Sequence, residues 1–244
     1  MVQDLSNVTI LIYTFPEKGN EAGAFSKIVA AIEKTWKLCG ELQTVIVTSH
    51  LFDEVQSFAA GHSNVELQIE TSLVYGSINT MSYDCITRLH TRFSTPYVLI
   101  IQEDGYPIRE GLEEFVGKWD FIGAPSVRDR RRKIMNMIGF PCLNGGFSLR
   151  SHRICKRAAN AWRWWWRFFL SPKSRFFPED TFYTLTACLG FCYRSGLRFP
   201  NERDAFRFAY DSLDGMIIKP KDLSPFGIHG HSTIELLKAE KNDI

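Results

Sequence analysis

The first residues that could do chemistry stand at the end of an apolar run, in the stretch YVLIIQEDG at 97–105. Five apolar or aromatic residues in a row are typical of a central strand covered on both faces, and ligands bind at the carboxyl ends of such strands in open α/β sheets. If the chain stays extended, Gln102 and Asp104 share one face while Glu103 points to the other. Gly105 then allows a ligand to approach the backbone closely.

Asp104 is therefore a candidate metal ligand, because hard oxygen ligands suit Mg²⁺ or Mn²⁺ that is also bound by phosphate oxygens. The structural alternative is that Glu103 and Asp104 only cap a neighbouring helix or end the strand. These residues taken alone favour neither interpretation.

A second candidate is the glycine pair in LNGGFSLRS at 143–151. Asn144 before Gly145 and Gly146 predicts a backbone that can adopt positive φ and come within contact distance of a bulky substrate, with Phe147 beside it. The alternative is an ordinary hairpin turn.

Two further motifs carry acids and histidines. In FPED at 177–180, Glu179 and Asp180 follow a proline suited to the first turn of a helix. The helix dipole explains acids there, and it also favours the ionised carboxylate that a general base needs, which points to Asp180. In FGIHGH, His229 and His231 are two residues apart between glycines, so they are candidate metal ligands, although terminal histidines are often surface residues.

The elements that must position these residues alternate between strand and helix patterns in the first half of the chain. The expected strands and helices lie at 7–15, 23–39, 43–49, 65–70, 80–93 and 97–101. Strands separated by helices of this length predict βαβ units. The predicted fold class is α/β, a single Rossmann-like domain over 1–244 with a mostly parallel central sheet flanked by helices.

Residues 1–110 are interpreted as the nucleotide-binding half and residues 111–244 as the acceptor-binding half, where the pattern is less regular. Short strands are expected near 118–126 and after the glycine pair. Helices are expected from about 152 to 170 and from about 177 onward.

The composition argues against some classes of protein. With 45% hydrophobic residues, 23% charged residues and a net charge of +2, the chain resembles a globular enzyme and lacks the basic excess of a nucleic-acid-binding protein. Its six cysteines include no CxxC pair, so reduced thiols are expected. The start of the chain lacks a signal-peptide pattern, and no apolar run reaches the roughly 20 residues that span a bilayer. A cytoplasmic protein is expected.

The order of motifs resembles a known family. QxDG after an apolar strand, then DFIGAP, NGGFSLRS, PED and FGIHG, is similar to a family of proposed bacterial glycosyltransferases catalogued as a domain of unknown function. That family in turn resembles nucleotide-sugar transferases of the GT-A fold. The resemblance covers roughly residues 80–232, and NGGFSLRS is its most specific part.

The resemblance implies a nucleotide-sugar donor and a divalent metal, Mn²⁺ or Mg²⁺. In GT-A enzymes a strand-end motif, usually Asp-x-Asp, holds the metal that bridges the donor diphosphate. Here Gln102 and Asp104 stand at its two positions, so one carboxylate is replaced by an amide. A late histidine often completes the metal shell, and His229 matches the family pattern better than His231.

The resemblance also implies roles for the other motifs. An acidic pair that opens a helix is where inverting members keep their base, which corresponds to Asp180 or its neighbour Glu179. The glycine loop is assigned to the substrate through Asn144, Gly145, Gly146 and Phe147. Donor contacts are assigned to the ends of two strands, at Tyr13, Thr14, Gln102, Glu103, Asp104 and Gly105.

An aromatic segment, AWRWWWRFFLSPKSRFF at 161–177, has a different composition from the rest of the chain. On a helical wheel most of its aromatic residues extend one core-facing stripe. Trp164 and Phe168 fall off that stripe among arginines, which suits a membrane interface or a stacked sugar. Peripheral contact with the inner face of a membrane, or with a lipid-linked acceptor, is thus one hypothesis for these two residues.

The leading hypothesis is a metal-assisted, inverting glycosyltransferase that moves a sugar from a nucleotide sugar to a hydroxyl of a polysaccharide, glycan or glycolipid acceptor. Two alternatives stay open. One is a non-catalytic carbohydrate- or nucleotide-binding module, suggested by the missing second aspartate. The other is a nucleotidyltransferase, which shares the sheet and the acidic strand end.

Overall fold

The computed structural model describes residues 5–17, 19–74, 77–125, 143–163, 179–188, 196–213, 216–217, 223–230 and 233. The elements of the first half are β1 (Val8–Thr14), α1 (Glu21–Cys39), β2 (Thr44–Thr48), α2 (Asp53–Gly61), β3 (Val65–Ile69), α3 (Ile78–Thr87), the 3₁₀ helix η1 (Leu89–Thr91), β4 (Tyr97–Ile100) and β5 (Gly105–Pro107). The remaining elements are the 3₁₀ helix η2 (Leu112–Glu114), β6 (Phe121–Pro125), β7 (Leu143–Ser151), α5 (His152–Ala161), α7 (Glu179–Cys188), α8 (Glu202–Phe208), β8 (Ala209–Leu213), β9 (Met216–Ile217) and β10 (Gly227–His229).

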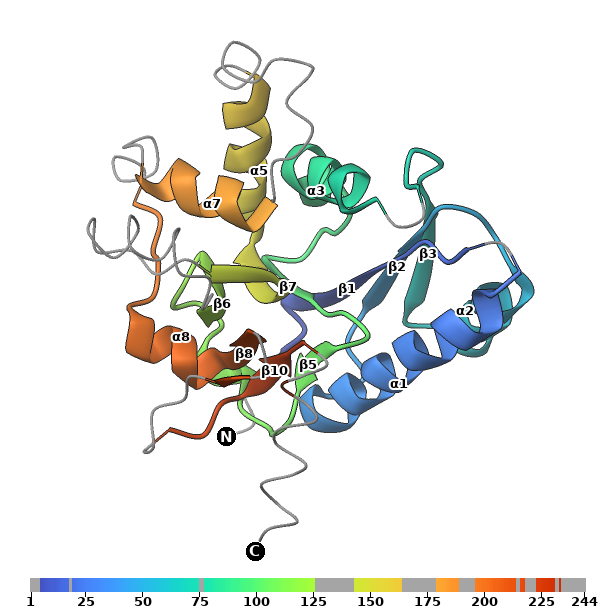
Figure 1. The fold of residues 1–244 in the computed structure, drawn as a ribbon, viewed down its shortest axis with the longest axis horizontal. Coiled ribbons are helices and arrows are strands. Elements are labelled where there is room, and N and C mark those ends of the chain that lie inside the picture. Colours follow the sequence, from blue (N-terminus) through green and yellow to red (C-terminus); the bar gives the residue numbers. More distant parts are fainter. Residues whose placement is uncertain are drawn as a thin grey trace, which may run out of the picture.

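The central sheet has six strands in the order β3-β2-β1-β4-β7-β6 (Figure 1). The four strands of the first half pair in parallel, with Ile10 opposite Thr44 and Val8 opposite Tyr97. Strand β7, however, runs antiparallel to both β4 and β6. The prediction of a mostly parallel sheet was therefore wrong in the second half, and the sheet is mixed. The βαβ pattern that predicts parallel pairing is confined to the first half of the chain, and an antiparallel pair does not require a crossover helix.

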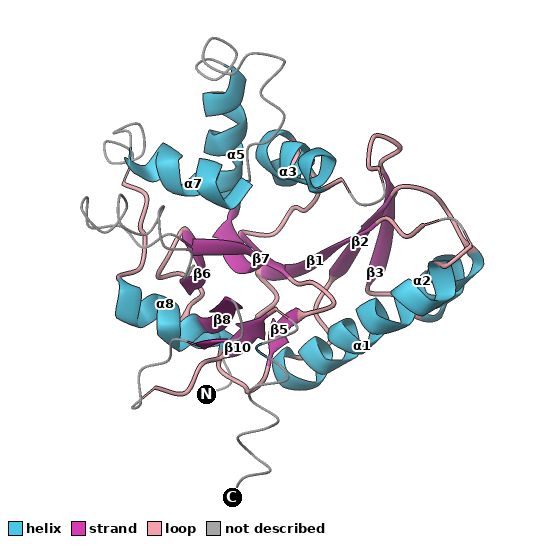
Figure 2. Cartoon of the chain, in the orientation of Figure 1, coloured by secondary structure: helices cyan, strands magenta, loops and turns pink. Residues whose placement is uncertain are grey.

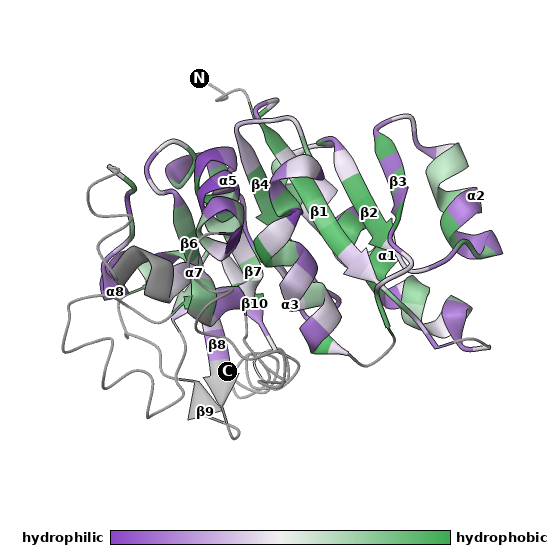
Figure 3. Cartoon of the chain, turned by 90° about the horizontal axis from the view of Figure 1, so that it is seen from above, coloured by the Kyte–Doolittle hydropathy of each residue, from purple (hydrophilic) through white to green (hydrophobic). Residues whose placement is uncertain are grey.

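The inner strands are buried on both faces, as predicted for 97–101. Alternate side chains of these strands contribute to two separate clusters, so that Leu99 joins one and Val98 and Ile100 join the other. Helices α1 and α2 cover the first face, and α3, α5 and α7 cover the second (Figure 1). Figure 3 shows the resulting hydrophobic strands between helices whose outer sides are hydrophilic.

A second, smaller sheet has the order β5-β10-β8-β9 and lies beside the carboxyl end of β4 (Figure 2). The chain passes from the first sheet to the second through a tight turn in which Gln102 and Gly105 exchange two backbone hydrogen bonds of 2.9 and 3.1 Å. The smaller sheet packs on the same core as α1, through side chains that include Tyr106, Ala209 and Ile228. The sequence analysis missed this sheet because its strands are short and come from distant segments.

Several other predictions can be compared with the structure. Helix α5 begins at the predicted residue, with the Ser151 hydroxyl accepting a hydrogen bond from the Ile154 N–H as its N-cap. Cys39, Cys85 and Cys155 are buried free thiols. No helix in the part of the chain that the structure describes is long and apolar enough to cross a membrane. Trp164, Phe168 and His231 lie outside the described residues.

A buried carboxylate joins the far edge of the sheet to α5. Asp120, only 2% exposed, accepts hydrogen bonds from the Ser151 hydroxyl (2.7 Å), the Arg153 guanidinium (2.6 Å) and the Arg198 N–H (2.7 Å). Burial by itself raises the pKa of the Asp120 carboxyl, but these donors outweigh it, so that the pKa lies below its ordinary value. A group with a lowered pKa in the folded state stabilises the fold above its unfolded pKa, and this contribution is lost as the pH falls through the folded pKa.

We therefore expect Asp120→Asn to lower the free energy of unfolding at pH 7 by about 2 kcal/mol, because the donors lose a charged acceptor. The deficit should shrink as the pH falls below about 4, where the wild-type carboxyl also becomes protonated. Urea denaturation at several pH values measures both effects, with Glu33→Gln on the exposed side of α1 as the control. A deficit that does not change with pH would contradict the role of the charge.

Candidate functional site

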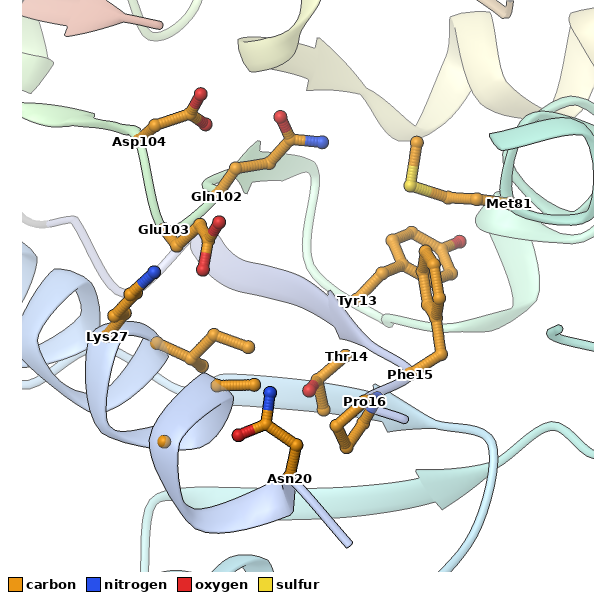
Figure 4. Close-up of a pocket in the computed structure, with 13 residues that line it drawn as sticks. Tyr13, Thr14, Phe15, Pro16, Asn20, Lys27, Met81, Gln102, Glu103 and Asp104 are labelled. Carbon is orange, nitrogen blue, oxygen red and sulfur yellow. The ribbon is translucent and has the colours of Figure 1, made fainter. Parts of the chain in front are cut away.

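A cavity of about 720 Å³ opens at the carboxyl ends of β1 and β4. This volume lies within the range typical of small-molecule sites, and the position is the one at which open α/β sheets bind ligands. Figure 4 shows the aromatic side chains of Tyr13 and Phe15 on one side and Lys27, Glu103 and Asp104 on the other. Its lining residues are Tyr13, Thr14, Phe15, Pro16, Asn20, Gly23, Ala24, Lys27, Ile28, Met81, Gln102, Glu103 and Asp104.

Five of the six residues predicted to contact the nucleotide-sugar donor thus line one cavity. They are Tyr13, Thr14, Gln102, Glu103 and Asp104. Tyr13 is fixed there because its hydroxyl donates a 2.7 Å hydrogen bond to the buried Asp84. Sequence reasoning missed Lys27, which α1 contributes. A lysine on the cavity-facing side of the first helix could not be distinguished from an ordinary solvent-exposed lysine before β1 and α1 were placed together.

The carboxylates Glu103 and Asp104 occupy the two central positions of the turn between Gln102 and Gly105. The predicted alternation along an extended strand is therefore wrong, since β4 ends at Ile100 and the chain reverses within four residues. Both carboxylate-bearing residues line the cavity, so Glu103 is not turned away from it. The Asp104 carbonyl also accepts a 2.9 Å hydrogen bond from the Gly230 N–H, which connects the turn to the end of β10.

His229 lies at the centre of the second group of predicted residues. Strand β10 places it opposite Gly105 on one side and Asp211 on the other. Its Nδ1 is 3.3 Å from the Asp211 carboxylate and its Nε2 is 3.2 Å from the Gln102 side-chain oxygen. Gly105 permits this arrangement because any larger residue would press against the imidazole and against Phe147.

The hydrogen bonds continue beyond the histidine. Asn144 donates a 3.2 Å hydrogen bond to Asp211, and its own oxygen accepts one of 2.8 Å from the Gly146 N–H. Side chains from the turn after β4 and from β7, β8 and β10 are thereby joined in one chain of contacts. Sequence reasoning missed Asp211 because no motif marks it, and only the parallel pairing of β8 with β10 brings it to His229.

The His229 imidazole is surrounded by carboxylates. Burial lowers its pKa, but the hydrogen bond and charge of Asp211, together with the charges of Asp104 and Glu179, outweigh burial, and the pKa lies above its ordinary value. A protonated ring can donate from both nitrogens, to Asp211 and to Gln102.

The two glycines of the 143–151 stretch lie within strand β7, and neither has a positive φ. The predicted reason for these glycines was therefore wrong, and so was the alternative of a hairpin turn. A Cβ at Gly146 would overlap the His229 imidazole and the Gln102 amide, and a Cβ at Gly145 would overlap Glu179. Close packing against the side chains of His229, Gln102 and Glu179, rather than a special backbone conformation, requires glycine here.

Glu179 is held by a buried partner that the sequence analysis did not select. Arg150, fully buried, donates a 3.2 Å hydrogen bond to the Glu179 carboxylate and another of 3.1 Å to the Gly145 carbonyl. The Ser82 hydroxyl of α3 donates a second hydrogen bond, of 3.3 Å, to the Glu179 carboxylate. Asp180, the next residue of α7, is only partly buried and so differs from Glu179 in its access to solvent.

Helix α3 connects this acidic pair to the cavity. Met81 lines the cavity, and its neighbour Ser82 contacts Glu179. Phe147, in contrast, is fully buried. Its ring stacks on that of Phe208 in the core, with ring centroids 5.1 Å apart, so its side chain packs behind the site and is not available to a substrate. The structure thus places the residues predicted to contact the sugar donor near the two glycines and the acidic pair. It also corrects the role of Phe147.

The predicted metal site is only partly described. Within the described ranges no group of three or more His, Cys, Asp or Glu side chains is arranged to hold a metal ion. Both ring nitrogens of His229 face other side chains, and Gln102 replaces a carboxylate. The described residues therefore do not fit a metal by themselves, and His231, the third predicted ligand, lies outside them.

The fold of this chain is similar to that of a solved glycosyltransferase. The bifunctional glycosyltransferase WbbM, in its apo form, has a TM-score of 0.55 and 11% identity to this chain, and the alignment covers 93% of this chain and 46% of WbbM. GlyE from Streptococcus pneumoniae TIGR4, also in an apo form, has a TM-score of 0.48 and 10% identity over 91% of this chain and 53% of GlyE. The mannosyltransferase PcManGT from Pyrobaculum calidifontis, in complex with GDP-Man and Mn²⁺, has a TM-score of 0.44 and 16% identity over 80% of this chain and 55% of its own.

The chain thus spans about half the length of these solved proteins, and the similarity to WbbM shows a common α/β fold. The chain belongs to the family described as "Protein of unknown function (DUF5672)", whose model matches residues 70–229. This agrees with the predicted resemblance to a family of unknown function. No curated protein matches the chain in sequence.

We expect Gly146→Ala to disturb the junction between the two sheets, because the added methyl group must displace the His229 imidazole or the Gln102 amide. Overpacking of this kind costs about 1–3 kcal/mol of unfolding free energy. The matched control is Gly61→Ala at the end of α2, where a Cβ meets no atom within 4 Å. Urea denaturation and NMR of the histidine rings measure the result. An unchanged His229 signal and a stability equal to that of the control would contradict the packing described here.

Proposed function

We propose that this protein is a glycosyltransferase that binds a nucleotide sugar in the cavity at the carboxyl ends of β1 and β4. The observation that carries the proposal is the combination of that cavity with the acidic turn at Gln102–Gly105, on a fold shared with the glycosyltransferase WbbM. The acceptor is a hydroxyl of a polysaccharide, glycan or glycolipid. The cytoplasmic setting inferred from the sequence is part of the same proposal.

The cavity offers a distinct partner for each part of such a donor. The faces of Tyr13 and Phe15 can stack on a nucleobase. Lys27 brings a positive charge that suits the diphosphate, whose negative charge must be stabilised as the bond to the sugar breaks. The carboxylates of Glu103 and Asp104 can accept hydrogen bonds from ribose or sugar hydroxyls. These assignments follow from the positions of the side chains around the cavity.

His229 supports the proposal from the side of the smaller sheet. Its imidazole links Gln102, which lines the cavity, to Asp211 of the smaller sheet. The glycines at 145 and 146 leave room for this ring and for the Arg150–Glu179 pair. The substrate role predicted for Asn144, Gly145 and Gly146 is therefore proposed as positioning, through Asp211 and His229.

The acidic pair of α7 supplies the proposed base. Glu179 is buried and hydrogen-bonded to Arg150 and Ser82, so its carboxylate is already engaged. Asp180 is more exposed, and we assign it the role of general base. The acceptor oxygen bonds to the anomeric carbon, the bond from that carbon to the diphosphate oxygen breaks, and the acceptor proton passes to Asp180. Attack opposite the leaving group makes the reaction inverting.

Metal assistance by Mn²⁺ or Mg²⁺, through Asp104, His229 and His231, remains a prediction. It is tested by assaying donor hydrolysis and sugar transfer over a panel of nucleotide sugars, after chelation and after adding back each metal. Turnover with one donor supports the proposed function. Binding without turnover of any donor would favour the carbohydrate- or nucleotide-binding module, and release of pyrophosphate from a nucleoside triphosphate would favour a nucleotidyltransferase.

Asp180→Asn gives the sharpest single test of the base. The variant keeps the volume of the side chain but cannot accept a proton, so transfer should fall by roughly 10²–10⁴-fold. Donor affinity should survive, because the donor contacts lie on β1, α1 and the acidic turn. Isothermal calorimetry, thermal melting and the transfer rate measure these three properties.

Asp53→Asn is the matched control, since Asp53, like Asp180, is an acid in the first turn of a helix, and it is exposed. Loss of the helix-dipole interaction costs each variant no more than about 1 kcal/mol of stability. If Asp180→Asn behaves like Asp53→Asn and keeps its transfer rate, the assignment is wrong and Glu179 is the next residue to test.

A further inference from the structure

Helix α5 carries only positive charge. From Ser151 to Arg163 the sequence contains four arginine or lysine residues and no acid, and all four are exposed. Arg153 is paired with the buried Asp120. We call the other three, Lys156, Arg157 and Arg163, the basic face of α5. Among the described residues no carboxylate lies within ion-pair distance of any of them.

The basic face is fixed in direction by the packing of the helix. Ile154, Cys155, Ala158 and Ala159 are buried against the sheet and its helices, which leaves the opposite side of α5 for the cations. Lys156 and Arg157 are adjacent residues of α5, and Arg163 follows two residues after the helix ends at Ala161. Because the apolar side of α5 is already part of the core, the helix cannot turn that side toward another surface.

Two histidines, His152 of α5 and His90 of η1, lie close to the basic face. The His152 Nε2 lies 2.9 Å from the His90 carbonyl oxygen, and the two rings are 6.4 Å apart. Burial lowers the pKa of His90, and the charges of His152, Arg163 and Lys156 lower it further. These groups are therefore close enough to repel one another, which indicates that the cations are concentrated and would gain from an anionic partner.

An aromatic side chain borders the basic face. Tyr83 of α3 is 52% exposed and packs edge-on against Trp162, with ring centroids 5.8 Å apart, next to Arg163 in the sequence. Helix α3 also exposes Ile78, at 50%. In Figure 1, α3 and α5 lie side by side above the central sheet. Cations beside exposed aromatic and apolar side chains are typical of proteins that rest on a membrane surface.

We propose that the basic face of α5, together with Tyr83, binds the surface of a membrane that contains anionic lipids. Charge complementarity favours anionic headgroups, and the aromatic border favours a lipid interface over a fully hydrated polyanion. The contact is peripheral, because the apolar side of α5 is buried in the core. The proposal concerns a surface outside the donor cavity and does not depend on the transferase activity.

The test measures binding of the full chain to large unilamellar vesicles by sedimentation. Vesicles of phosphatidylcholine alone are compared with vesicles that also contain phosphatidylglycerol, at low and at high salt. We expect binding only to the anionic vesicles and loss of that binding at high salt, because the surface charge is then screened.

The variant is the double charge reversal Lys156→Glu/Arg157→Glu, which should weaken binding to anionic vesicles by at least roughly tenfold. The matched control is Lys37→Glu/Lys118→Glu, which changes the net charge equally at exposed positions of α1 and of the segment before β6. The control should bind nearly as well as the wild type. Circular dichroism verifies that both variants are folded.

The variant Tyr83→Ser distinguishes binding to a membrane surface from binding to a hydrated polyanion. It should weaken binding to anionic vesicles while leaving binding to heparin, used as a soluble polyanion, unchanged. Three results would overturn the proposal: no binding of the wild type to anionic vesicles, an equal loss in the two double variants, or tight binding to heparin without binding to vesicles.

Discussion

The arrangement of the site depends on one turn of four residues, Gln102–Gly105, at which the chain leaves the central sheet and enters the smaller one. Two backbone hydrogen bonds close this turn, and they fix the direction in which β5 departs. Strand β5 then pairs with β10, so the register of that pairing places His229 beside Gly105. The cavity wall and the histidine are consequently positioned by the same short segment.

Close packing at the junction explains the glycines better than backbone freedom does. At Gly105, Gly145 and Gly146 the space that a side chain would need is filled by His229, Glu179 and neighbouring groups. Phe147 and the other core phenylalanines support these positions from below. The site is therefore built from strands that approach one another where side chains are absent. This brings polar groups from the Gln102–Gly105 turn and from β7, β8 and β10 within hydrogen-bonding distance.

Charge is divided between two parts of the molecule. Near the cavity, the carboxylates of Asp211 and Glu179 lie within hydrogen-bonding distance of His229 and Arg150, respectively, and all four residues are buried or partly buried. On the basic face of α5 (Lys156, Arg157 and Arg163) the cations stand on the outer side without described carboxylate partners. A buried ion pair such as Arg150–Glu179 is costly to desolvate and is sustained by its additional hydrogen bonds, so it serves to hold α7 at a defined place relative to the glycines.

The sequence by itself determined the local elements and the list of polar residues worth considering. The apolar run at 97–101 predicted a strand covered on both faces, and the helical spacing at 23–39 predicted α1, because burial patterns reflect periodicity along one segment. Pairing between distant segments has no such local signal. The antiparallel direction of β7, the smaller sheet, the turn that places Glu103 in the cavity and the contact of Asp211 with His229 were all decided by tertiary structure. Their physical cause is long-range: strand register and the space left by glycines depend on which segments meet, and single-segment patterns do not contain that information.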